Sequence, residues 1–320
     1  MSVIGTNIEE AAAHLREGRL VAIPTETVYG LAGNAFNPEA VAGIFAAKQR
    51  PAFDPLICHV ASMEQVEGLI TTMPAAARTL GRAVWPGPLT MILPRGPKVP
   101  DLVTSGLDTV GVRIPRHPMT LALLQELDFP LAAPSANPFG YVSPTSAAHV
   151  ERFLGDKLAY ILDGGEAQVG IESTIVGFEE GGLIVYRMGG MSIEQLREMS
   201  GTDAIRVMAH SSSNPKAPGM LKSHYAPRIP FVLGDIPALA AAHAGKSLAL
   251  LSFEQNYPDI SAAHRIVLSP GGRLEEAARR LFAALRELDD SGVDFILAEE
   301  VPDEGLGKAI NDRLRRAAAR

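Results

Sequence analysis

The sequence is poor in cysteine and in aromatic residues. Cys58 is the single cysteine among 320 residues, so the chain forms no internal disulfide and no zinc site built from several cysteines, as expected for a protein of a reducing compartment. Aromatic residues make up 6% of the chain and the formal net charge is −7. These values argue against a broad stacking or basic surface for nucleic acid. An anionic ligand must therefore be held by a local group of basic side chains.

Long apolar runs and processing signals are also missing. No run approaches the roughly 18 apolar residues that indicate a membrane span. The opening segment, MSVIGTNIEEAAAHLREG, is acidic and polar, unlike a signal or transit peptide. We therefore expect a cytoplasmic protein without membrane contact. The sequence also has no Walker A pattern and no paired metal-ligand spacing, so no metal site made by the protein is expected.

Helix and strand patterns predict two α/β units joined by a linker. In residues 1–207, short apolar strands alternate with helices, and several strands are close enough in sequence to pair antiparallel, which predicts a mixed sheet. Residues 208–227 are rich in Ser, Pro and other polar residues and are predicted to be the linker. Residues 228–320 alternate more regularly and predict a smaller, mostly parallel, Rossmann-like sheet.

Hydroxyl and basic side chains follow the first predicted strand and helix. The segment PTETVYGL (residues 24–31) begins where a strand leaves the sheet, which is a common ligand position in α/β folds. Lys48 and Arg50 lie at the end of a helix predicted over residues 37–48. Both can hold phosphate or carboxylate oxygens. They can equally compensate the partial negative charge of the helix C-terminus.

The next strand, predicted over residues 56–60, places Cys58 and His59 on opposite faces. No His–Asn pattern accompanies Cys58, so we assign it to the core rather than to a nucleophilic role. A single histidine after an apolar strand is more often a structural residue than a ligand. His59 therefore has both interpretations open.

Two later segments carry further candidate ligand groups. Thr109 and Arg113 are four residues apart on one predicted strand, so both can point into one pocket. A buried Arg113 needs an anionic partner, either a ligand or a structural salt bridge. Ser135 and Asn137 stand at alternate positions of a strand-to-loop corner. They can bind phosphate, ribose or adenine edges, or they can be ordinary turn residues.

Seven short motifs occur in a fixed order: PTETVYGL, KQRP, DPLICHV, WPGPLT, GLDTVGVRIP, APSAN and GIESTI. In this order they closely resemble the YrdC-like family. The second half, with PGMLKSHYAP and GLGKAINDRLRRAA, resembles the long, two-domain form of the L-threonylcarbamoyladenylate synthases. The resemblance covers nearly the whole chain. It implies that the first unit is a twisted mixed sheet with a basic cavity.

The resemblance also implies a reaction. L-threonine, bicarbonate and ATP would give L-threonylcarbamoyladenylate and pyrophosphate, with Mg²⁺ on the phosphates of ATP. The product would pass to the machinery that transfers the threonylcarbamoyl group to tRNA, with weak or indirect contact between this chain and tRNA. Three alternatives stay open: an RNA-binding module, a regulatory sensor without turnover, and a carbamoyl-transfer domain. The last one normally brings a zinc-finger region, which a chain with one cysteine cannot supply.

The family's functional positions carry over to residues of this sequence. The catalytic set would be Lys48, Arg50, Ser135 and Asn137. The threonine-binding set would be Thr27, His59, Arg113, Ser173 and Thr174. The nucleotide-binding set would be Lys48, Arg50, Asp54, Thr109, Ser135, Ser143, Arg187 and Tyr225.

Two positions depart from the family and one segment has two interpretations. Asp54 replaces an asparagine of many relatives, so it could weaken phosphate binding or recruit Mg²⁺. Ala133 replaces a hydroxyl residue of some relatives, which would leave a backbone contact to threonine. Tyr225 would close over the cavity as part of a lid formed by residues 218–227, or would anchor the linker to the second unit.

Overall fold

The computed structural model describes residues 2–51, 53–179, 181–208 and 224–319, which form two sheets. The first is an 11-stranded sheet in the order β1-β8-β2-β3-β7-β4-β6-β5-β9-β10-β11. Its strands are β1 (Val3–Gly5), β2 (Val21–Ile23), β3 (Gly30–Asn34), β4 (Ile57–His59), β5 (Leu89–Pro94), β6 (Thr109–Arg113), β7 (Leu131–Ala132), β8 (Tyr160–Leu162), β9 (Thr174–Glu179), β10 (Gly182–Arg187) and β11 (Ile205–Val207). Parallel pairs such as β4–β6 and antiparallel pairs such as β5–β6 both occur, so the expected mixed sheet is confirmed.

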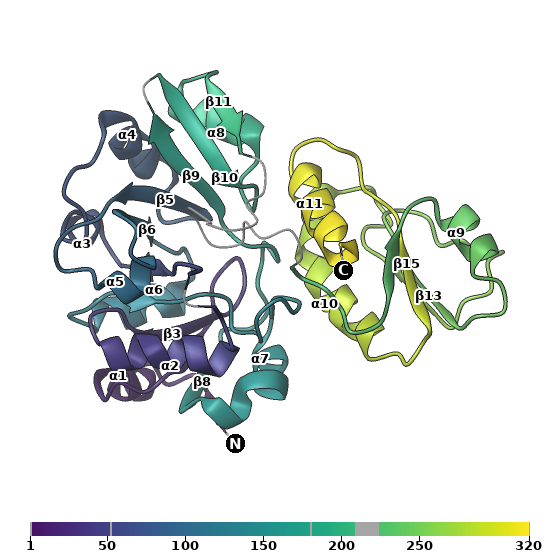
Figure 1. Ribbon diagram of the computed structural model, residues 1–320, viewed down its shortest axis with the longest axis horizontal. Coiled ribbons are helices and arrows are strands. Elements are labelled where there is room, and N and C mark those ends of the chain that lie inside the picture. Colours follow the sequence, from purple (N-terminus) through teal and green to yellow (C-terminus); the bar gives the residue numbers. More distant parts are fainter. Residues whose placement is uncertain (1, 52, 180, 209–223, 320) are drawn as a thin grey trace.

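Helices accompany this sheet along the first unit (Figure 1). They are α1 (Ile8–Arg16), α2 (Pro38–Lys48), α3 (Met63–Glu67), α4 (Ala75–Val84), α5 (Asp101–Thr104), α6 (Pro118–Gln125), α7 (Ala147–Leu154) and α8 (Ile193–Ser200), with a 3-10 turn over Gly155–Lys157. The helix α2 shows how the sequence sets an end. The Asn37 side chain accepts hydrogen bonds from two backbone N–H groups at its start, and Gln49 takes a left-handed conformation (φ 54°) at its end. Lys48 therefore closes the helix, and Arg50 begins the chain that returns to the sheet.

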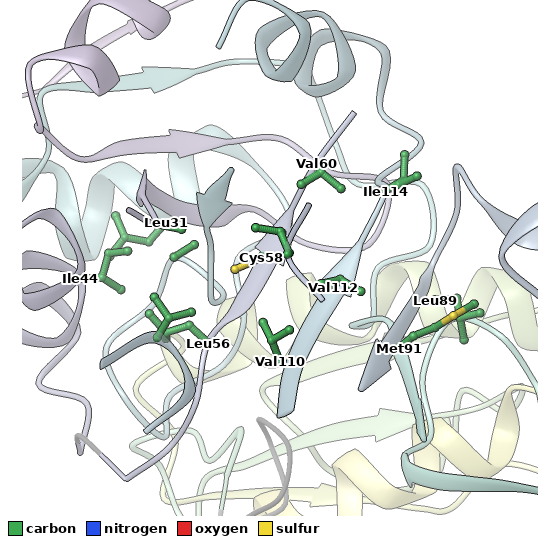
Figure 2. Packing of buried hydrophobic residues seen from close by; sticks show 14 of the residues in the cluster. Leu31, Ile44, Leu56, Cys58, Val60, Leu89, Met91, Val110, Val112 and Ile114 are labelled. Carbon is green, nitrogen blue, oxygen red and sulfur yellow. The ribbon is translucent and has the colours of Figure 1, made fainter. Parts of the chain in front are cut away.

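The core of the first unit is formed by alternate residues of its strands and by the inner faces of its helices. Leu56, Cys58 and Val60 lie in one apolar cluster with residues of the neighbouring strands, as Figure 2 shows. Cys58 is fully buried there, and burial raises the pKa of Cys58 to about 12. The assignment of Cys58 to the core is therefore confirmed.

The second unit is a four-stranded sheet in the order β12-β15-β13-β14, and all of its strand pairs are parallel. Its elements are β12 (Phe231–Leu233), α9 (Ile236–Ala242), β13 (Leu248–Ser252), β14 (His264–Val267), α10 (Leu274–Asp289), β15 (Phe295–Ala298) and α11 (Gly307–Ala318). This matches the expected small parallel sheet. Side chains alternate along β13: Leu248 and Leu250 pack in the cluster of α9, whereas Ala249 and Leu251 pack in the cluster of α10 and α11.

The helices α10 and α11 lie between the two sheets and join the units (Figure 1). Their apolar residues share one cluster with Val142 and Ile171 of the first unit. Gly170 takes a positive φ of +79° and packs so closely on α10 that a Cβ there would overlap the backbone of Arg279. Arg286 reaches across from α10 and donates hydrogen bonds to the carbonyl oxygen atoms of the segment 142–149. The two units thus share a core instead of merely touching.

Across the described ranges, no helix combines the length and apolar character that a membrane crossing requires.

Candidate active site

A cavity opens in the first unit, and residues near the start of the second unit complete its wall. It encloses about 530 Å³ not occupied by protein atoms, including its open mouth. Its lining residues are Thr27, Val28, Arg50, Leu56, Ile57, His59, Arg113, Ala133, Pro134, Ser135, Glu172, Ser173, Arg187, His224 and Tyr225. Most of the lining residues have polar or charged side chains and three of them are arginines, which favours an anionic ligand.

Arg113, at the end of β6, is held by a carboxylate of the PTET segment. Its Nη2 lies 2.7 Å from Oε1 of Glu26, and both side chains are almost fully buried. Its Nη1 donates to the Thr27 hydroxyl at 3.0 Å. Burial raises the pKa of Glu26, but the attraction and hydrogen bond of Arg113 outweigh this and leave that pKa below its usual value. The structural salt bridge left open by the sequence is therefore present, in the wall of the cavity.

Lys48 is buried beside the loop that carries Ser135 and Asn137. Its Nζ donates to the carbonyl oxygens of both residues, at 2.6 Å for Asn137. Burial, with Arg50 nearby, lowers the pKa of the Lys48 ammonium well below its usual range. The Asn137 amide donates to the Tyr141 carbonyl at 2.8 Å and shapes the same loop. A buried cation held by neutral carbonyl groups can still attract an anion.

Arg50 and Asp54 form a buried ion pair one turn apart. Arg50 Nη2 lies 2.9 Å from Asp54 Oδ2, and Arg50 Nε donates to the Asp54 carbonyl oxygen at 3.0 Å. Burial raises the pKa of Asp54, while Arg50 and Lys48 oppose that rise. The Asp54 carboxylate therefore faces an arginine of the site.

His59 lines the cavity from β4, opposite in facing to Cys58. Its Nδ1 lies 3.3 Å from the Ile57 carbonyl oxygen, and burial together with Arg113 lowers the pKa of His59 to about 3. The ring is thus neutral near pH 7. Ala133, on the same wall, uses its backbone N–H for the Ile57 carbonyl, so its own carbonyl oxygen is the polar group left for a ligand.

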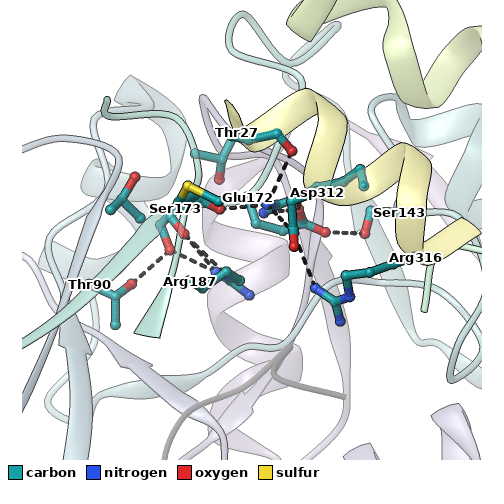
Figure 3. Close-up of polar contacts among 12 residues, drawn as sticks. Thr27, Thr90, Ser143, Glu172, Ser173, Arg187, Asp312 and Arg316 are labelled. Carbon is teal, nitrogen blue, oxygen red and sulfur yellow. Dashed lines mark hydrogen bonds and ion pairs between the residues drawn. The ribbon is translucent and has the colours of Figure 1, made fainter. Parts of the chain in front are cut away.

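Ser173 lies where β9 begins and joins two neighbours, as Figure 3 shows. Its hydroxyl is 2.8 Å from that of Thr90, and Arg187 Nη2 donates to it at 3.1 Å. The adjacent Thr174 hydroxyl instead donates to the Met191 carbonyl oxygen at 2.6 Å and accepts from the Met191 N–H at 3.0 Å. Ser173 therefore faces the cavity, while Thr174 fixes the turn behind it.

Tyr225 contacts both the cavity and the second unit, as its anchoring alternative requires, while its closing over the cavity as a lid stays a prediction. It lines the cavity beside His224, and its ring also stacks on Phe282 of α10 with a centroid distance of 5.4 Å. Its positive φ of 64° turns the chain toward the second unit. The predicted lid, residues 218–227, lies largely outside the described residues, which include only 224–227 of it.

The structure brings most of the predicted site residues together. Eight of them line the cavity: Thr27, Arg50, His59, Arg113, Ser135, Ser173, Arg187 and Tyr225. Asp54, Lys48 and Ser143 contact lining residues from behind. Asn137 shapes the loop that carries Ser135, and Thr174 lies behind Ser173. Thr109 lies at the other end of β6 from Arg113, paired with Pro94, and is not among the lining residues, so its part in nucleotide binding stays a prediction.

Sequence reasoning assigned no role to three residues that shape the cavity. Glu172 lies inside GIESTI and His224 inside the HYAP segment, so their motifs marked the right places. Arg313, in the closing GLGKAINDRLRRAA motif, pairs with Glu172 from α11 at 3.1 Å. Nothing in the local sequence signals this pairing, because 141 residues separate the two positions.

Metal-binding groups are scarce in the parts of the chain that the structure describes. There, no group of three or more His, Cys, Asp or Glu side chains could hold a metal ion. The carboxylates at the cavity, Glu26, Asp54 and Glu172, are each paired with an arginine. The site does not fit a metal ion held by protein carboxylates.

Comparisons with known proteins agree over nearly the full length. Residues 13–189 match the Sua5–YciO–YrdC family, described as telomere recombination, and residues 191–319 match the family described as threonylcarbamoyl-AMP synthase, C-terminal domain. The threonylcarbamoyl-AMP synthase of Pyrococcus abyssi is 43% identical over 97% of this chain and 94% of its own. That of Bacillus subtilis is 40% identical over 99% and 94%.

Solved structures extend the likeness to the fold. The P. abyssi Sua5 structure complexed with L-threonine has a TM-score of 0.92 and 41% identity, covering 99% of this chain and 97% of that one. Escherichia coli YciO, with a TM-score of 0.52 and 22% identity, covers 59% of this chain and 96% of its own and shares the fold of the first unit.

Proposed function

Because the chain belongs to the threonylcarbamoyl-AMP synthase family in its two-domain form, we propose that its cavity makes L-threonylcarbamoyladenylate from L-threonine, bicarbonate and ATP. The family places the chain among nucleotidyltransferase enzymes that serve tRNA modification. The observation that carries the proposal is the cavity itself. It brings the buried Arg50, Arg113 and Arg187 to one polar wall, which suits two carboxylates and a triphosphate.

Two bond-forming steps account for the product. The threonine nitrogen bonds to the carbon of bicarbonate, with loss of water and a proton, and gives a carbamate. A carbamate oxygen then bonds to the α-phosphorus of ATP while the bond from that phosphorus to the bridging oxygen breaks, and pyrophosphate leaves. A carboxylate is already a nucleophile, so no general base is needed for the second step. Positioning and charge stabilisation supply most of the rate.

The cavity offers two ends for these substrates. Thr27, His59, Arg113 and Ser173 form the proposed threonine end, where the arginine receives the amino-acid carboxylate. Lys48, Arg50, Ser135, Asn137 and Arg187 form the proposed end for the phosphates and the carbamate, with Ser143 and Tyr225 behind and above it. The neutral His59 ring suits a contact with the uncharged threonine hydroxyl or with the amine that must lose its proton.

The proposal also includes Mg²⁺ and the tRNA-modifying machinery. Mg²⁺ enters as the ion that accompanies the phosphates of ATP, since the carboxylates of the cavity are paired with arginines. The adenylate passes to the machinery that modifies tRNA, and this chain contacts tRNA weakly or indirectly, in keeping with its net charge of −7.

Pyrophosphate release is expected to require L-threonine and bicarbonate together. Either substrate alone leaves the carbamate unformed, so ATP meets no nucleophile other than water. The measurement is pyrophosphate release, with the adenylate identified by mass spectrometry. Equal release in the absence of threonine would replace the synthase proposal with a plain ATPase.

Cys58→Ala is expected to keep the rate of adenylate formation within about twofold. Its thiol lies in the core, away from the cavity, and the reaction has no thioester step. The cost should appear in stability instead, about 1 kcal/mol for a small core truncation. Kinetics and thermal denaturation of the same sample separate the two effects. If the Cys58→Ala protein is folded but inactive, the thiol of Cys58 acts as a nucleophile and this prediction is wrong.

A further inference from the structure

Arg313 belongs to the second unit, and its guanidinium contacts residues of the cavity wall. It projects from α11 and is fully buried. Its Nη2 donates to Glu172 Oε2 at 3.1 Å and its Nη1 donates to the Met188 carbonyl oxygen at 2.5 Å. On its other side Nη1 lies 3.0 Å from Asp312 Oδ2. The guanidinium is thus held by acceptors on two sides, and Glu172 accepts the hydrogen bonds from one of them.

Glu172 is the acidic residue of a cavity that must take anions. It lines the cavity and is 6% exposed. Its second carboxylate oxygen accepts a hydrogen bond from Ser143 at 2.6 Å, and the next residue is Ser173 of the threonine end (Figure 3). An unpaired carboxylate here would repel the phosphates of ATP and both substrate carboxylates, because charge interactions are strong where water is excluded.

Arg313 also contacts Tyr225, a second lining residue of the cavity. The Arg313 guanidinium carbon lies 5.4 Å from the centre of the Tyr225 ring, and Arg316 lies on the same ring at 4.8 Å. Tyr225 and Glu172 both line the cavity. One arginine of α11 therefore contacts two parts of the wall, Glu172 of the first unit and Tyr225 at the end of the linker.

We propose that Arg313 is a positioning residue of the adenylation site: it neutralises Glu172 and fixes its carboxylate toward Ser143, so that the cavity accepts ATP. This inference rests on the proposed function for its kinetic consequences. It assigns the second unit a direct part in the site, because the charge balance of the cavity includes a side chain from α11. Arg313 acts through Glu172 and touches no reacting atom itself.

The test compares Arg313→Met with the double variant Arg313→Met/Glu172→Gln. In the single variant a buried carboxylate loses its partner, so the KM for ATP is expected to rise at least roughly tenfold while kcat changes less. The double variant removes the repulsive charge and is expected to recover most of the ATP affinity. Arg313→Lys keeps the positive charge, so its KM for ATP should lie between those of Arg313→Met and the wild type.

The pH profile gives a second readout. The charged or titratable groups that face Glu172 are Lys48 from α2, Arg187 from β10, Tyr225 from the segment before β12 and Arg313 from α11. Without Arg313, burial favours the protonated form of Glu172. The KM for ATP of Arg313→Met should therefore approach the wild-type KM as pH falls from 8 to 6. The comparison uses the ratio of the two KM values for ATP at each pH. The titration of Lys48 cancels in this ratio because both proteins contain Lys48.

Arg315→Met is the matched control, since Arg315 lies on the same helix but pairs with Glu300 at the surface. It is expected to behave as the wild type. Titration calorimetry with ATP alone measures binding without turnover. A wild type that makes no adenylate would overturn the proposed function, while the ATP titrations would still test Arg313. Unchanged ATP affinity in Arg313→Met, or equal losses in the single and double variants at every pH, would overturn the role of Arg313.

Discussion

Arg113→Ala is expected to abolish most of the use of L-threonine and to destabilise the fold at the same time. Arg113 donates to Thr27 at the proposed threonine end, and it is paired with the buried Glu26. Removing one member of a buried ion pair costs about 3–5 kcal/mol, because the remaining charge stays buried. Loss of a charge-assisted contact to the substrate carboxylate costs about 1.5–3 kcal/mol, or roughly tenfold to 150-fold in kcat/KM. Steady-state kinetics and denaturant unfolding measure the two losses.

A double variant separates the substrate role from the structural one. Arg113→Met/Glu26→Gln replaces the ion pair with uncharged groups of similar size, which is often neutral for stability. It should fold like the wild type and still fail to use threonine, while ATP binding is largely kept. If the double variant regains normal kinetics with threonine, Arg113 is a structural ion pair only.

The stability loss of Arg113→Ala should also depend on pH in a defined direction. In the wild type the pKa of Glu26 is lowered, so its stabilising contribution is present at neutral pH and is lost as pH falls through that pKa. In the variant burial raises the pKa of Glu26, so the penalty is largest at neutral pH and shrinks as the acid takes a proton. The difference in unfolding free energy between the two proteins should therefore narrow on acidification.

Lys48→Met is expected to lower kcat/KM for ATP by roughly tenfold to 150-fold, the value of one charge-assisted contact of about 1.5–3 kcal/mol. Methionine keeps the apolar stem and removes the ammonium. Because burial lowers the pKa of Lys48, the wild type should lose ATP affinity as pH rises, and the Met variant should lose this dependence. Calorimetric titration with ATP across the neutral to alkaline range measures both effects.

Lys157→Met serves as the control for this variant. Lys157 also donates to a backbone carbonyl, that of Ala47 at 3.1 Å, but Ala47 does not line the cavity, whereas Lys48 donates to the lining residue Ser135. It should bind ATP as the wild type does. A normal ATP affinity in Lys48→Met, with an unchanged pH dependence, would assign Lys48 to the structure of the loop at 135–137.

Local patterns in the sequence predicted much of the architecture. The helix ending at Lys48 has capping residues at both ends, and the strand ending at His59 is a short apolar run, so both elements were predictable. The short elements β1, β3 and β11 and the helices α3, α5, α7 and α8 were not predicted. The strand β11 (Ile205–Val207), for example, has only three residues and is mostly exposed, and its pairing with β10 makes it a strand.

The site was predicted less completely, for a physical reason. Motifs marked the residues that line the cavity, because those residues cluster where strands end. The partners that set their charge come from elsewhere: Glu26 meets Arg113 from another strand end, and Arg313 meets Glu172 from another unit. Such pairings depend on the packed geometry and leave no pattern in the sequence.

The close packing of Gly170 on α10 bears on how the chain folds. At Gly170 the backbone of the first unit touches the backbone of α10, and Arg286 donates to carbonyl groups of the segment 142–149 across the same interface. That segment includes Ser143, which donates to the lining residue Glu172 from behind. The first unit made alone would therefore keep its sheet while losing order in one side of its cavity. The two units are expected to melt as a single cooperative body, and their docking is expected to order one side of the catalytic cavity.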